Sequence, residues 1–437
     1  MTRRTTVAAA AALVAVSMPA ASPAAADAQI SAQSYVCPTT ADDQVVQSPV
    51  ASEPRTYLDL DLADRILAQR GITPGQGVKV AVLDSGVVSQ NTYAPIDVVA
   101  PTSFSPGPVV NAHGTAVAGL IAAKPQSSDS GPIPVGIAPG AEIVDLKVYD
   151  DTPESSDHGG IDPGNVAAAL RWLVAHAEAE RIRIAVLAMN IGPDPEVESA
   201  IDALSKKNIV ILAATGNRVT TGSGDGSDRM DAYATPKPGE DVAKVVYPAG
   251  YTRQVVGVTA TADGVPGEDG PIDASGQVLF SSAIDLAMPT YGATTVSLNG
   301  STCVLQTVET SWAVAEAAGV LALLMSAYPD ESAAAVEARM LRTADGRVSE
   351  IGINRLYGAG VPQPVDALTR VLHPRADGSL APAQFRPREY PAAAAPPRSA
   401  DPLGDVLERG MWWAILGGAA IVMTALLRPL LSRRRPG

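Results

Sequence analysis

Three polar residues in separate local motifs could together carry out nucleophilic acyl transfer. Asp84 ends the apolar run 80–83, His113 opens a His-Gly-Thr motif, and Ser311 precedes a long stretch of small and apolar residues. This chemistry needs an attacking hydroxyl, a base that takes its proton, and a carboxylate that orients the base. The chain order Asp, His, Ser is one of the few in which such a triad recurs. The motifs therefore predict a Ser/His/Asp triad.

The elements around these residues explain how they could meet. The continuous apolar runs 80–83 and 209–213 are typical of parallel strands that are buried on both faces. Catalytic groups collect at the carboxyl ends of such strands, where Asp84 and Asn217 are expected. The amide of Asn217 could donate a hydrogen bond to a developing oxyanion. An apolar helix is expected over 116–123, directly after His113.

Each motif also has an ordinary structural interpretation. Asp-Ser-Gly is a common turn, His-Gly-Thr can simply start a helix, and Ser311 could be an N-cap. Of the four histidines, His158 lies in a polar loop, His176 in the helical segment 166–178, and His373 before a Pro-rich stretch. Only His113 has a catalytic context, and the joint pattern favours the triad.

The same motifs resemble the subtilisin-like family, in their order and over most of the chain. The further landmarks that match are 135–139, 143–148, 189–192, 213–217, 247–251 and 285–289. The resemblance implies an α/β fold with a mainly parallel sheet flanked by helices. It also implies that Asp84, His113 and Ser311 are catalytic and that Asn217 completes the oxyanion hole. Asn190, Ile191 and Gly192 would line the substrate cleft.

The chain departs from the family pattern near the serine. Glu309 stands where the family has Gly beside the primary specificity pocket, Ala315 replaces a Pro, and Glu316 replaces a His. The Glu309 side chain could block the pocket, bind a basic substrate residue, or turn to solvent. The second of these predicts a preference for a basic or small residue before the scissile bond. A buried Glu316 would need partners or a raised pKa.

The two ends of the chain predict export and membrane anchoring. Residues 1–26 have a basic start, the apolar core 7–16 and an Ala-rich cleavage region, as in a secretory signal peptide; two Thr after Arg3-Arg4 argue against a twin-arginine signal. The uncharged stretch 410–427 begins with two Trp, spans about 27 Å and is followed by arginines. The positive-inside rule places the C-terminus in the cytoplasm and the large domain outside the cell membrane. A buried core helix is the alternative, and no sortase motif precedes the stretch.

These observations divide the chain into segments. The expected order is a signal peptide (1–26), an N-terminal extension (27–76), a subtilisin-like peptidase domain (77–371), a Pro/Ala-rich linker (372–409), a transmembrane helix (410–431) and a basic tail (432–437). Within them, the apolar spacing over 57–69 predicts an amphipathic helix that docks on the domain, and 218–244 is expected to be a surface insertion.

Composition excludes several other functions. A net charge of −14 argues against nucleic-acid binding. The sequence has no Gly-rich phosphate loop and no clustered Cys/His set, so no cofactor is expected, while a structural calcium ion remains an open question. The two cysteines, Cys37 and Cys303, fit one disulfide in an exported protein.

This architecture resembles the mycosins, membrane-anchored subtilisin-like proteases of type VII secretion systems. The resemblance implies a polypeptide substrate and a partner, the secretion complex in the membrane. Three functions remain open at this stage: an endopeptidase with few substrates, a scaffold subunit whose active site is dispensable or blocked, and a degradative protease of the cell surface.

Overall fold

The computed structural model describes residues 36–38, 43–150, 161–219, 228–262, 274–344, 355–380 and 404–431. The predicted signal peptide and basic tail lie outside these ranges, as does most of the predicted linker. Contacts divide the chain into two units, Met1–Pro382 and Ala383–Gly437, each of which is described by itself.

A seven-stranded parallel sheet forms the centre of the first unit, with the order β2-β3-β1-β4-β5-β6-β7. The strands are β1 (Lys79–Asp84), β2 (Val98–Ser103), β3 (Glu142–Lys147), β4 (Ile182–Leu187), β5 (Val210–Ala214), β6 (Val256–Thr261) and β7 (Leu286–Pro289). Alternate side chains of β1 enter different hydrophobic cores. Val80 and Val82 lie in the core on one face of the sheet, and Ala81 and Leu83 lie in the core on the other face. Both faces are therefore covered, which is why these strands are continuously apolar.

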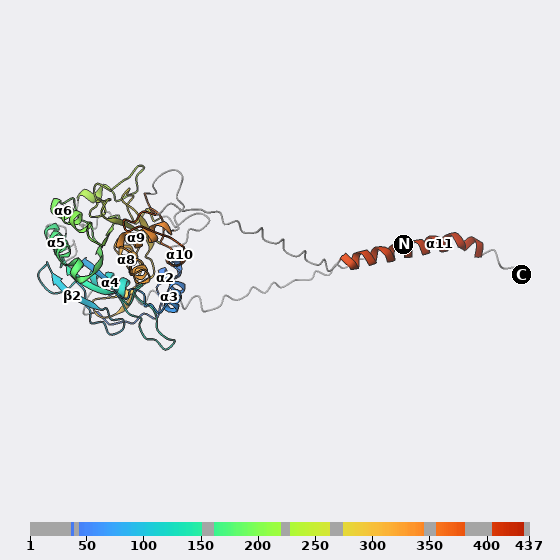
Figure 1. The fold of residues 1–437 in the computed structure, drawn as a ribbon, viewed down its shortest axis with the longest axis horizontal. Helices are drawn as coiled ribbons and strands as arrows, with labels where there is room; N and C mark the ends of the chain where they lie inside the picture. Colours follow the sequence, from blue (N-terminus) through green and yellow to red (C-terminus); the bar gives the residue numbers. More distant parts are fainter. Residues whose placement is uncertain are drawn as a thin grey trace, which may run out of the picture. The chain divides into compact units, whose positions relative to one another are not determined.

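Helices pack on both faces of this sheet (Figure 1). The core that contains Val80 also contains α4 (His113–Ala122) and α8 (Thr310–Ala327), whereas α5 (Pro163–Glu180) and α6 (Pro195–Leu204) cover the opposite face. Further helices of this unit are α7 (Asp228–Asp231), α9 (Ala333–Arg342) and α10 (Pro364–Thr369). Helix α8 is apolar enough to cross a membrane but is buried in the domain. The predicted fold class is confirmed.

The predicted amphipathic helix over 57–69 is divided in two. Helix α2 (Glu53–Tyr57) ends before Asp59, and α3 (Leu60–Gln69) begins after it. Asp59 has a left-handed φ of 51°, which separates the two helices. Leu58, Leu60 and Leu67 are buried in the core, so the segment docks on the domain as predicted, but Leu62 is 38% exposed and does not belong to the docking face. Two residues along a helix turn the side chain by about 200°, so Leu60 and Leu62 point in nearly opposite directions.

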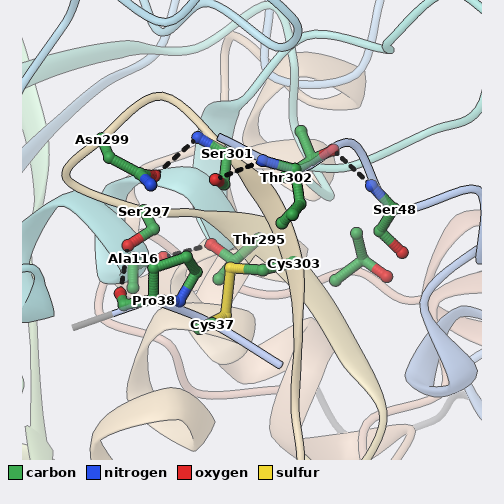
Figure 2. Close-up of a disulfide and its surroundings, with 12 residues drawn as sticks. Cys37, Pro38, Ser48, Ala116, Thr295, Ser297, Asn299, Ser301, Thr302 and Cys303 are labelled. Carbon is green, nitrogen blue, oxygen red and sulfur yellow. Dashed lines mark hydrogen bonds between the residues drawn. A yellow bond between two sulfur atoms is a disulfide. The ribbon is translucent and has the colours of Figure 1, made fainter. Parts of the chain in front are cut away.

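The N-terminal extension is attached to the antiparallel hairpin of β8 (Ala293–Val296) and β9 (Thr302–Leu305). Val36 and Gln47 form parallel bridges with Val304 and Thr302. The predicted disulfide between Cys37 and Cys303 is present (Figure 2). The extension therefore adds backbone pairing and one covalent bond to the hairpin.

The C-terminal segments begin elsewhere than predicted. Helix α11 (Gly404–Leu431) starts six residues before the expected Gly410, and Leu407, Glu408 and Arg409 are good helix formers that extend it on this side. Its part Val406–Pro429 contains an 18-residue stretch with a mean hydropathy of 1.8. Residues 372–380, expected to be linker, pack on the domain: the Leu372 carbonyl accepts from Arg339 Nη2 at 3.0 Å, and Pro374 bridges Leu380. The linker therefore does not start at 372.

A buried ion pair fixes the described part of the insertion that follows β5. Arg218 Nη2 lies 2.8 Å from Glu240 Oε1, and the two side chains are only 2% and 1% exposed. Glu240 also accepts from the Phe280 amide at 3.0 Å. The pair therefore links the two ends of the insertion, and the Phe280 amide joins Glu240 to the rest of the domain.

Truncation of Glu240 should be strongly destabilising. Glu240→Ala leaves the Arg218 charge buried and unpaired, which is expected to lower the free energy of unfolding by about 3–5 kcal/mol. Urea unfolding followed by circular dichroism measures this. Glu196→Ala, which breaks an exposed pair with Arg171, should change it by less than about 1 kcal/mol. Equal effects of the two variants would contradict the assignment.

Candidate active site

Asp84 and His113 form the centre of the site. Asp84 ends β1, and His113 is the first residue of α4. His113 Nδ1 lies 2.8 and 3.0 Å from the two Asp84 carboxylate oxygens, and Asp84 is fully buried. The predicted pair is therefore in direct contact.

Two glycines allow this approach. Gly86 turns the chain after Asp84 with a φ of +97°. A Cβ on Gly114 would lie 2.6 Å from the Gly86 carbonyl oxygen and 3.1 Å from Asp84 Cβ. The Gly114 amide donates to Ser85 Oγ at 2.9 Å, which joins the turn after β1 to the start of α4. The Asp-Ser-Gly and His-Gly-Thr motifs thus describe one interlocked structure.

Ser311 is the second residue of α8 and is 6% exposed. The ring of the next residue, Trp312, lies 4.8 Å from the His113 ring. The first turn of α8 therefore faces His113. Among the described residues no hydrogen bond joins Ser311 Oγ to His113, a looseness that is common where no substrate is bound.

Asn217 is tied to the same turn of α8. Its side-chain oxygen accepts from the Thr310 amide at 2.8 Å, which directs the Nδ2 donor away from that contact. The Gly216 amide donates to Thr310 Oγ1 at 3.3 Å. The Asn217 amide is thus fixed next to Ser311, where an oxyanion donor is needed.

The three residues expected to line the cleft differ in position. Asn190 is exposed and Gly192 is half-buried, but the Ile191 side chain is buried in the core. Ile191 also exchanges two backbone hydrogen bonds with Tyr247, at 2.7 and 3.2 Å. Because a strand alternates its side chains, Ile191 has to point inward where Asn190 points out. The Ile191 side chain therefore points into the core, and that Asn190, Ile191 and Gly192 line the substrate cleft stays a prediction.

Glu309 is half-buried at the N-cap of α8 and acts on His113 electrostatically. Burial alone would lower the pKa of His113, but the Asp84 carboxylate and then Glu309 outweigh it, so the pKa is raised. Glu309 is therefore close enough to the site to stabilise a cation there. Glu316 is different: it is fully buried, and burial raises its pKa well above the ordinary value, which favours the neutral form of this acid.

Tyr149 is a site residue that no sequence motif pointed to. Its hydroxyl donates to Asp84 Oδ1 at 2.8 Å and lies 3.3 Å from His113 Nδ1. Burial, with the Asp84 charge, raises the pKa of Tyr149 well above its ordinary value, so the phenol stays a donor. The available signal was its place two residues beyond β3, the strand paired with β1.

Comparison with known proteins agrees with the fold and this geometry. Residues 75–360 match the subtilase family, Peptidase S8. The chain therefore belongs to the subtilase family of serine peptidases. M-protease from Shouchella clausii is 30% identical over 313 residues, which cover 69% of this chain and 66% of that protein.

One mycosin is similar over a greater length of the chain. Mycosin-1 of Mycolicibacterium smegmatis is 26% identical over 422 residues, which cover 89% of this chain and 91% of that protein. The crystal structure of MycP1 from the ESX-1 type VII secretion system has a TM-score of 0.55 at 23% identity, over 77% of this chain and 91% of that one. A chain of an intact ESX-5 inner membrane complex gives 0.54 at 23% identity, over 90% of this chain and 95% of that one. The resemblance to the mycosins is confirmed.

Removal of the Tyr149 hydroxyl should slow the reaction without affecting substrate binding. A hydrogen bond to a carboxylate is worth about 1.5–3 kcal/mol, so Tyr149→Phe is expected to lower kcat about tenfold with little change in KM. The acid limb of the pH–rate profile should move to higher pH, because a less stabilised Asp84 anion attracts the protonated His113 more strongly.

The control for this measurement is Tyr251→Phe. The Tyr251 hydroxyl donates to the Asp194 carbonyl at 3.0 Å, and its loss should leave the pH profile in place. A Tyr149→Phe enzyme with an unchanged kcat and pH profile would remove Tyr149 from the site.

Proposed function

We propose that the chain is a membrane-anchored serine endopeptidase that cleaves polypeptides outside the membrane. The observation that carries the proposal is the contact of His113 Nδ1 with both oxygens of the buried Asp84. A paired imidazole at the start of a helix, facing the turn that bears Ser311, is the arrangement that activates a hydroxyl.

In this reaction Ser311 Oγ attacks the peptide carbonyl, and His113 Nε2 takes the hydroxyl proton. Asn217 Nδ2 donates to the oxyanion that forms. His113 then passes its proton to the leaving amine, and water hydrolyses the acyl-enzyme by the same steps. Asp84 stays ionised throughout and stabilises the imidazolium.

Glu309 gives the site a negative charge that the family pattern lacks. It lies beside the first turn of α8 and favours the protonated form of His113. A cation on the substrate would receive the same attraction. We therefore assign Glu309 to substrate selection, with a basic or small residue preferred before the scissile bond.

Membrane anchoring through α11 is supported by its length and composition. The 24 residues of Val406–Pro429 span about 36 Å, more than the ~30 Å of a hydrocarbon core. The arginines that follow place the C-terminus in the cytoplasm by the positive-inside rule. The similarity to a chain of the ESX-5 inner membrane complex supports a type VII secretion complex as partner.

A second candidate function is a structural subunit of such a complex whose site is restricted. The acidic Glu309 at the first turn of α8 favours it, because a side chain there occupies space that a Gly leaves open. In this case the protein would support assembly of its membrane partners without turning over peptides.

Reaction with a fluorophosphonate probe tests the proposed nucleophile. Wild-type protein should be labelled and Ser311→Ala should not be. Asn217→Ala should keep KM and lower kcat by about 10²–10³-fold, since one oxyanion donor is lost. Ser326→Ala, a change on the same helix far along the chain from the site, should label normally. Labelling that persists on Ser311→Ala would sink the assignment, and an unlabelled wild type that still assembles with its partners would favour the structural subunit.

Neutralising Glu309 should change both the pH profile and the selectivity. His113 has to be neutral to accept a proton, so activity rises with pH through its pKa, and a raised pKa places this rise at higher pH. Glu309→Gln lowers the pKa of His113 and should move the acid limb to lower pH, while cleavage after basic residues should weaken about tenfold relative to apolar ones. The exposed Glu196→Gln serves as control. An unchanged profile and an unchanged peptide-library preference would show that Glu309 does not act on substrate.

A further inference from the structure

A hollow of about 640 Å³ adjoins the His113 ring. Its lining comes from four parts of the chain that are far apart in sequence: the start of α4, Asp150 after β3, the hairpin strands with the segment up to α8, and the N-terminal extension. His113 and Trp312 bound it on the side of the proposed active site, and Val36, Cys37 and Pro38 bound it on the side of the extension.

The position of this hollow relative to the proposed reaction follows from its lining. The acyl half of a substrate would lie against Asn190, Gly192, Asn217 and Glu309, and none of these lines the hollow. His113 does line it, and His113 has to hand its proton to the leaving amine. The chain that follows the scissile bond must therefore pass the His113 ring, next to the hollow.

The chemistry of the lining is mainly apolar. Val304 and Leu305 contribute buried side chains, and Trp312 is 8% exposed. At the rim Val36 and Val110 are 49% and 50% exposed, so apolar surface there is left for a ligand to cover. The Asp150 carboxylate in the lining is already bound by Lys147 and by Ser105 Oγ at 2.5 Å. The hollow therefore suits a large apolar side chain rather than a charged one.

The wall made by the extension is held by several bonds. Val36 pairs with Val304, Cys37 is bonded to Cys303, and the Pro38 carbonyl accepts from Ser297 Oγ at 2.6 Å (Figure 2). Cys303 is fully buried. The extension is thus a fixed part of the hollow, and its loss would open one side.

We propose that the tethered extension 36–38 forms one wall of a binding pocket for a large apolar residue on the leaving-group side of the scissile bond. This inference rests on the proposed function, since the pocket is placed by the role of His113. It makes the extension part of the specificity machinery.

An acyl-transfer experiment measures the leaving-group side of the site separately from the acyl side. Full-length protein in detergent is acylated with a peptide ester, and the acyl-enzyme is partitioned between water and an added amine, Leu-Ala-amide or Gly-Ala-amide. The wild type should transfer the acyl group to the Leu amine about tenfold faster than to the Gly amine, because the Leu side chain fills the apolar pocket. Equal transfer to both amines would overturn the proposal.

Two variants of the extension test the wall. Val36→Trp fills the hollow and should abolish the Leu-over-Gly preference, and Cys37→Ser releases the wall and should reduce that preference. Val45→Ser, an exposed extension residue that does not line the hollow, should keep the wild-type ratio. A Val36→Trp protein with the wild-type ratio would refute the pocket.

A binding measurement separates failure of the pocket from failure of the proposed reaction. Leu-Ala-amide is titrated into Ser311→Ala protein and followed by Trp fluorescence, with Trp312→Phe to assign the signal. Saturable binding that is weakened in Val36→Trp and kept in Val45→Ser supports the pocket even if the wild type proves inactive. No binding, or binding that Val36→Trp leaves intact, overturns it.

Discussion

The buried carboxylate of Asp84 is the constraint on which the active-site half of the molecule depends. A charge without solvent is costly unless hydrogen bonds and an opposite charge compensate it. Asp84 receives the Ser85 amide at 2.7 Å, the Tyr149 hydroxyl at 2.8 Å and His113 Nδ1 at 2.8 Å. These donors come from the turn after β1, from the segment after β3 and from α4. The segments at the carboxyl end of β1 are therefore arranged around one buried anion.

Neighbouring carboxyl groups also take part in the electrostatics of the site. Burial raises the pKa of Asp145 on β3 to about 6, and the Asp84 charge adds to the effect even though the Val87 amide donates to Asp145. Burial lowers the pKa of His113, but the Asp84 carboxylate and the Glu309 charge raise it. The site thus combines one ionised buried carboxylate with acidic neighbours. The protonation of His113, and with it the state of the site, therefore depends on these neighbouring charges.

The N-terminal extension connects stability with the site. It pairs with the β8–β9 hairpin through backbone bridges and the Cys37–Cys303 bond, and it reaches the hollow beside His113. Cross-linking residues 266 apart in sequence reduces the conformational entropy of the unfolded chain, by about 6 kcal/mol at 25 °C in the chain-entropy model. The same bond that restrains the unfolded chain holds three residues at the edge of the cleft.

Features that depend on local backbone chemistry could be predicted from the order of the amino acids. The continuous apolar runs predicted strands buried on both faces, and the Ser-Gly after Asp84 predicted the sharp turn that Gly86 makes. Features that depend on packing between distant segments became visible only in the folded molecule. Tyr149 is a partner of Asp84 because β3 lies next to β1, a neighbour relation that no local motif encodes. Likewise, Ile191 pairs with the distant Tyr247, and the extension reaches the hollow beside His113 because the hairpin holds it there.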